Sequence, residues 1–60
     1  MKKERIMITK METVGKFTRI FGYTMLDGRS FVQDCFGDSE DAIKMMRTAF
    51  VIAKGSVMHV

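Results

Sequence analysis

Only one stretch of this 60-residue chain reads as a long helix, and that constrains the fold more than any other feature. Residues 37–55 read GDSEDAIKMMRTAFVIAKG. Either Asp38 or Ser39 can cap the first turn, and the acidic side chains that follow suit the positive end of the helix dipole. At the other end, Gly55 is typical of the left-handed position that closes a helix. We therefore predict a helix over 39–54, which leaves strands and turns for the rest of the chain.

Most of the apolar residues of this segment form one stripe at about 100° per residue, as expected for a helix that packs on a sheet. The stripe consists of Ala42, Ile43, Met46, Ala49, Phe50 and Ala53. Met45 and Ile52 lie on one flank of it. Two interpretations stay open: either the core is wider than the stripe, or Met45 and Ile52 belong to a second surface that binds a protein.

The other apolar residues occur in short, β-branched and aromatic runs that are typical of strands. We predict strands over 5–12, 17–26 and 29–36, and a short last strand over 56–60. Asp27-Gly28 predicts a hairpin with a two-residue loop, which would pair Tyr23 with Val32. The predicted fold class is α+β: an antiparallel sheet of three or four strands with one α-helix on one face, in the order β-β-β-α-β, as a single small domain over 1–60.

The predicted hairpin register separates two faces of the sheet. One face carries most of the rings and is the face on which we place the helix: Phe17, Phe21, Tyr23, Met25, Val32 and Phe36. The opposite face carries Ile20, Leu26 and Phe31 and is predicted to be open. Because one helix cannot cover both faces, we expect these three residues to bind a partner protein or a second copy in a homodimer.

The composition of the chain includes few of the residues that usually carry out catalysis. Cys35 is the only cysteine and His59 the only histidine, so the chain has neither an internal disulfide nor the ligands of a structural zinc site. Neither residue has a catalytic partner nearby in the sequence. We therefore expect a non-enzymatic protein without catalytic residues, cofactor or metal. No apolar run reaches the roughly 20 residues that span a bilayer, which predicts a cytoplasmic protein without membrane contact.

The net charge of +3 keeps nucleic acid open as an alternative partner. The segment GKFTRIFGY interleaves basic side chains with rings, a combination that stacks bases and neutralises phosphates. Lys10, Lys16 and Arg29 would then contact phosphates. The alternative function is therefore that of a small basic nucleic-acid-binding protein or transcriptional regulator.

Four short features of the chain are FT at 17–18, TM at 24–25, Ala-Phe at 49–50, and Val57 and Val60 in the closing segment. In these features the chain resembles the small host-takeover proteins of bacteriophages, such as the Dmd-type antitoxin of T-even phages. The resemblance covers about two-thirds of the chain. It implies a phage-type inhibitor, an antitoxin or anti-defence factor, that occupies a larger host or toxin protein in the host cell.

Overall fold

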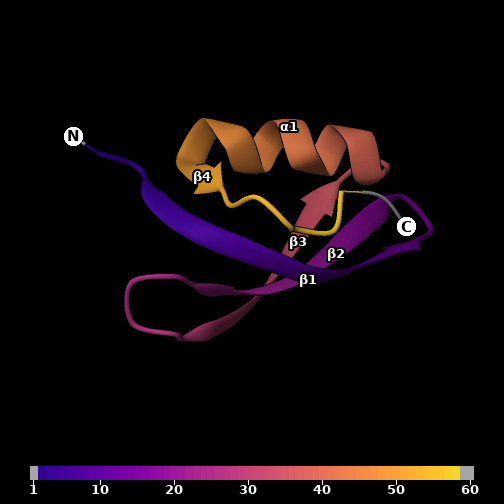
Figure 1. Cartoon of the computed structure of the whole chain (residues 1–60). Helices are drawn as coiled ribbons and strands as arrows, with labels where there is room; N and C mark the ends of the chain where they lie inside the picture. Colours follow the sequence, from indigo (N-terminus) through magenta and orange to yellow (C-terminus); the bar gives the residue numbers. More distant parts are fainter. Residues whose placement is uncertain (1, 59–60) are drawn as a thin grey trace.

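In the computed structural model, which describes residues 2–58, one helix lies across one face of a four-stranded sheet (Figure 1). Strands β1 (Glu4–Val14), β2 (Phe17–Thr24) and β3 (Ser30–Phe36) come first, followed by helix α1 (Ser39–Ala49) and strand β4 (Phe50–Ile52). The strand order is β3-β2-β1-β4. The first three strands are antiparallel, and β4 runs parallel to β1. The predicted α+β class and the order β-β-β-α-β are confirmed.

A bulge in β1 keeps the apolar residues of that long strand on one side. Ile8 pairs with Gly22 and Lys10 pairs with Phe21, so Thr9 has no partner across the ladder. The Thr9 hydroxyl donates to the Phe21 carbonyl at 3.2 Å. Because the extra residue reverses the alternation of side chains, Met11 points to the same side as Ile8.

The β2–β3 hairpin differs from the predicted one by two residues. Tyr23 pairs with Ser30 rather than with Val32, and four residues, 25–28, form the loop. A two-residue loop at Asp27-Gly28 would need positive φ at both positions, but only Gly28 has it, at 71°. The carboxylate of Asp27 instead accepts a hydrogen bond from the Thr24 hydroxyl inside the loop. A shift of two residues preserves which side chains share a face but changes the partner of each one.

The predicted helix end is also wrong. The Asp38 side chain caps the N-terminus as expected, accepting from the Asp41 N–H at 3.0 Å. The helix ends at Ala49, however, five residues before the predicted boundary, because Phe50–Ile52 takes extended geometry and pairs with β1. Aromatic and β-branched residues favour a strand where a neighbouring edge is free. Gly55 has the positive φ expected of it, 92°, but in a turn after β4 rather than at the end of the helix.

The predicted last strand over 56–60 is replaced by β4. Residues 56–58 are not in a strand, although the Val57 N–H donates to the Ile8 carbonyl at 2.9 Å. The Ser56 hydroxyl accepts from the Ile8 N–H at 3.0 Å, so this segment still runs beside β1. Residues 59–60 lie outside the described part of the chain.

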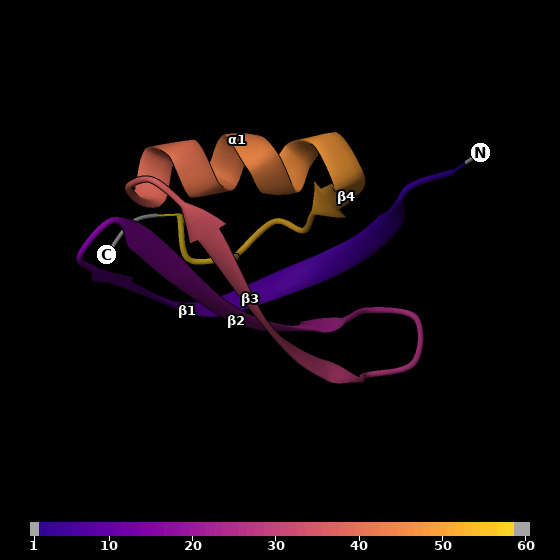
Figure 2. The ribbon, with the colours of Figure 1, turned by 180° about the vertical axis from the view of Figure 1, so that it is seen from behind.

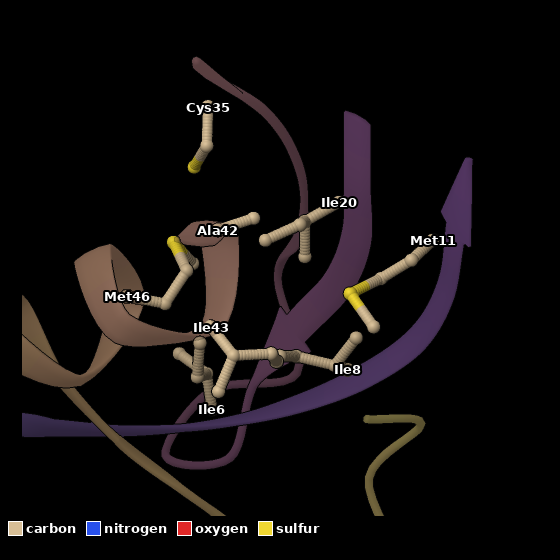
Figure 3. Close-up of a cluster of buried hydrophobic side chains, with 8 residues drawn as sticks. All are labelled: Ile6, Ile8, Met11, Ile20, Cys35, Ala42, Ile43 and Met46. Atoms are coloured by element: carbon tan, nitrogen blue, oxygen red, sulfur yellow. The ribbon is translucent and has the colours of Figure 1, made fainter. Parts of the chain in front are cut away.

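The core lies between α1 and one face of the sheet (Figure 3). Its buried members come from β1, β2, β3 and α1: Ile6, Ile8, Met11, Ile20, Cys35, Ala42, Ile43 and Met46. Most sheet positions beneath the helix are small or β-branched, including Thr18 and Gly22. Such positions let a helix approach a sheet closely, whereas a layer of rings would hold it away. The helix therefore covers the face opposite to the one that we predicted.

Candidate functional site

The face of the sheet opposite α1 is uncovered and carries most of the exposed apolar side chains of the strands. In both ribbon views the helix lies on one side of the sheet, and no other helix or strand lies on the opposite side (Figures 1 and 2). Val14, Phe17, Val32 and Phe36 are 69%, 51%, 58% and 63% exposed, respectively. We call these four residues the ring patch.

The strand pairing brings three members of the ring patch together, whereas Val32 pairs with Phe21 further along the sheet. Val14 pairs with Phe17 across β1 and β2, and Phe17 pairs with Phe36 across β2 and β3. The two rings meet edge to face, with centroids 5.2 Å apart and an interplanar angle of 70°. Such a contact fixes the two rings relative to each other and leaves their outer edges exposed. The patch is therefore an ordered apolar surface.

Two charged pairs lie on the same face as the ring patch, and one of them, Arg19–Asp34, lies between Val32 and the Phe17–Phe36 pair. Arg19 Nε lies 2.8 Å from Asp34 Oδ1, and Lys10 Nζ lies 3.4 Å from Glu12 Oε1. The hydrogen bond from Arg19 lowers the pKa of Asp34, and the same bond raises the pKa of Arg19. Lys10 also lies over the ring of Phe21, 5.4 Å from its centroid. These two pairs thus match four charges of this face within the chain.

A shallow pocket opens where the ring patch meets the first charged pair. Val14, Phe17, Arg19 and Asp34 line this pocket, whose volume is about 180 Å³. Apolar walls beside a paired guanidinium and carboxylate give a site that can accept a small apolar side chain from a partner. The pocket is too small for a drug-sized ligand.

The structure does not bring the five predicted protein-binding residues together. Ile20 is fully buried beneath the helix, so its predicted place on an open face is wrong. Phe31 also faces the helix side, where its half-buried ring stacks on that of Phe50 with centroids 6.4 Å apart. Both were misplaced because the helix covers the face that carries the smaller side chains.

The other three predicted protein-binding residues are scattered over the surface. Leu26 is 89% exposed, but it lies in the hairpin loop rather than on a sheet face. Met45 is 55% exposed on α1, whereas Ile52 in β4 is half-buried against the core. Met45 and Ile52 no longer share a helix flank, because Ile52 is not helical. The predicted second helical surface is therefore not formed.

The three predicted phosphate-contacting residues are all exposed, but they are also separated. Lys10 lies on the open face over Phe21, Lys16 lies in the β1–β2 turn, and Arg29 lies beside the hairpin loop. Arg29 Nε is 3.7 Å from Asp27 Oδ2. They form no single basic stripe.

The structure places the Cys35 thiol in the core. Burial raises the pKa of the Cys35 thiol, and the nearby Asp34 raises it further, so the reactive thiolate is disfavoured. His59 lies outside the described residues. Within residues 2–58, no three His, Cys, Asp or Glu side chains gather as metal ligands do, and no helix is long and apolar enough to cross a membrane.

The sequence prediction missed the ring patch as a site, because it placed Phe17, Val32 and Phe36 under the helix. The signal that identifies the covered face is side-chain size. Thr18, Gly22 and Cys35 alternate with the rings along β2 and β3, and their small volumes mark the side on which a helix can pack closely.

Comparisons of this chain with protein-family models, with curated proteins and with solved structures find no match.

Proposed function

We propose that this protein is a small non-enzymatic binding module that acts by occupying a larger protein with the open face of its sheet. The observation that carries the proposal is the ring patch. In a domain with one covering helix, four large apolar side chains are each more than half exposed on one face. Exposed apolar side chains gathered on one face of a small domain typically mark sites of protein association.

The composition of the face favours a protein as the partner. Interfaces between proteins combine an apolar centre rich in aromatic residues with a polar rim. Here Phe17 and Phe36 supply the centre, and the pairs Arg19–Asp34 and Lys10–Glu12 supply the rim. Because each rim charge already has a partner, docking need not leave a buried charge unpaired.

The kind of partner follows from the sequence resemblance to phage host-takeover proteins. We propose a phage-type inhibitor, either an antitoxin or an anti-defence factor, whose partner is a host or toxin protein. Such an inhibitor needs no catalytic group, because it acts by covering the working surface of its target.

The proposal is tested by pull-down of the tagged chain from nuclease-treated host lysate. The wild-type chain should retain a protein in stoichiometric amount, and the double variant Val32→Ser with Phe36→Ser should lose it while keeping its circular dichroism spectrum. Leu26→Ser is the matched control, because it removes a side chain of greater exposure away from the patch. Retention by the double variant, or loss with Leu26→Ser, would rule out the ring patch as the binding surface.

Nucleic-acid binding is the second candidate, and one observation favours it. The rings of GKFTRIFGY, which we had placed under the helix, lie on the open side, and Lys10 sits over one of them. Rings beside basic groups form a stacking platform for single-stranded bases. Affinity for a single-stranded oligonucleotide should then fall steeply with salt, with a slope of about −0.7 per neutralised phosphate. Binding through the ring patch to a protein should change little over the same salt range.

A further inference from the structure

We propose that the free edge of β3 pairs with β3 of a second copy, giving a weak two-fold dimer with one continuous sheet. Strand β3 is an edge strand, paired only with β2 in the described part of the chain. It is seven residues long and regular, and its sequence SFVQDCF contains no Pro and no Lys. Natural edge strands usually carry such residues, or a bulge, to prevent pairing.

Two hydrogen bonds establish which backbone groups of β3 are free. The Thr24 N–H donates to the Arg29 carbonyl at 2.8 Å, and the Gly37 N–H donates to the Lys16 carbonyl at 2.7 Å. The two bonds lie just beyond the two ends of the β2–β3 ladder. The pairs that they join, Thr24–Arg29 and Lys16–Gly37, continue the register of that ladder. Since hydrogen-bonded and non-hydrogen-bonded pairs alternate along antiparallel strands, the backbone groups of Phe31, Gln33 and Cys35 face β2.

The N–H and C=O groups of the alternate residues therefore point away from the sheet: Ser30, Val32, Asp34 and Phe36. One hydrogen bond is consistent with this orientation: the Asp34 carbonyl accepts from the Gln33 side-chain amide at 3.4 Å. Val32, Asp34 and Phe36 are all exposed. The edge thus offers a row of backbone donors and acceptors about 24 Å long, at about 3.4 Å per residue.

A second copy of β3 can satisfy this whole row. The four outward residues are evenly spaced about Gln33, so a two-fold axis at Gln33 pairs Ser30 with Phe36 and Val32 with Asp34 of the other copy. In that register every outward N–H and C=O of both strands finds a partner. At the opposite edge of the sheet, β4 has only three residues.

The charges on the edge also allow two like strands to meet. Asp34 is the only charged residue of β3, and its carboxylate is already held by Arg19 at 2.8 Å. Two copies therefore bring no unpaired like charges together. An edge without free charge offers little by which to select a charged foreign peptide.

The dimer should be weak. The surface of one copy is 4471 Å², and a standard interface of about 800 Å² per partner would take nearly a fifth of it. Edge pairing of seven residues covers less than this, which places the association among the transient ones. Pairing of the two β3 strands puts the open faces of both copies on the same side of the joined sheet. The dimer would therefore present two ring patches on one continuous surface.

The test measures amide hydrogen exchange by NMR and molecular mass by sedimentation, at protein concentrations from about 10 μM to about 1 mM. The exchange of the Val32 and Asp34 amides should slow by about tenfold or more as dimer forms, while Phe31 and Gln33 stay protected throughout. Val32→Pro removes one outward N–H without breaking the β2–β3 ladder, so it should fold and remain monomeric. Val32→Ala is the matched control, because it keeps that N–H and should still dimerise.

Several results would overturn the proposal. A monomer at every concentration would do so, as would a dimer in which the Val32 and Asp34 amides exchange at unchanged rates. A dimer of Val32→Pro would exclude this edge. Protection of these amides only after a partner protein is added would make the occupant a strand of the partner. Failure of the dimer leaves the proposed function standing, because the ring patch is tested separately by Val32→Ser with Phe36→Ser.

Discussion

Replacing Gly22 by Ala tests how closely β1 and β2 approach each other at the bulge. A Cβ at this position would lie 2.2 Å from the Met7 carbonyl oxygen and 3.0 Å from the Phe31 ring. The ring can turn aside, but the carbonyl belongs to the neighbouring strand and cannot move without shifting the ladder. Overpacking against such a neighbour costs about 3 kcal/mol, and the reduced freedom of the unfolded chain returns up to about 1 kcal/mol.

The expected net loss is therefore about 2 kcal/mol, from a domain whose whole stability is of the order of 3–9 kcal/mol. Thermal unfolding should begin about 8–16 °C earlier, at about 4–8 °C per kcal/mol for a domain of this size. Gly15→Ala shows the other cause of loss alone: its new Cβ has no atom within 4 Å, so any destabilisation comes from its φ of 61°, which Gly22 does not share. Phe31→Leu should not rescue Gly22→Ala, because the closest contact is with backbone. A Gly22→Ala variant as stable as the wild type would refute the reasoning.

Three further predictions concern polar and sulfur groups. Thr18 is fully buried and its hydroxyl donates to the Gly37 carbonyl at 2.9 Å, so Thr18→Val should lower the free energy of unfolding by about 1–3 kcal/mol in urea titration. Because burial raises the pKa of Cys35, alkylation of its thiol at pH 8 should be at least about tenfold slower in the folded than in the denatured chain; equal rates would contradict this. Because Arg19 holds the pKa of Asp34 below its ordinary value of 3.8, the stability from this pair is complete above about pH 4 and is lost as the pH falls through the lowered pKa. Asp34→Asn should flatten that acid limb of the stability curve, and an unchanged limb would show that the pair contributes nothing.

The sequence predicted the elements better than their boundaries. The start of the helix was predicted because Asp38 and Ser39 can both cap a first turn, and the structure shows that Asp38 does so. The predicted C-terminal end of the helix was wrong because a glycine such as Gly55 occurs both at the end of a helix and in a turn after a strand. Phe50–Ile52 consists of residues that favour strands. They form a strand here because the edge of β1 is available for pairing, and this availability depends on the tertiary structure.

The faces of the sheet could be separated from the sequence, but they could not be assigned from the number of rings. Phe17 and Val32 share a side in both the predicted and the observed registers, because a shift of two residues preserves alternation. The helix packs instead over Ile20 and Cys35, where small side chains leave room for it. The ring patch is exposed because the helix packs on the other face of the sheet. The candidate site could therefore be identified only from the structure.

The most direct measurement of the central claim, that α1 covers the Ile20 side and leaves the ring patch open, compares Ile20→Ala with Phe36→Ala in denaturant unfolding. Ile20 is fully buried, so its truncation should cost about 2–5 kcal/mol. Phe36 is 63% exposed and packs mainly on Phe17, so its truncation should cost no more than about 1.5 kcal/mol. A loss with Phe36→Ala that equals or exceeds the loss with Ile20→Ala would place the rings under the helix and contradict the account.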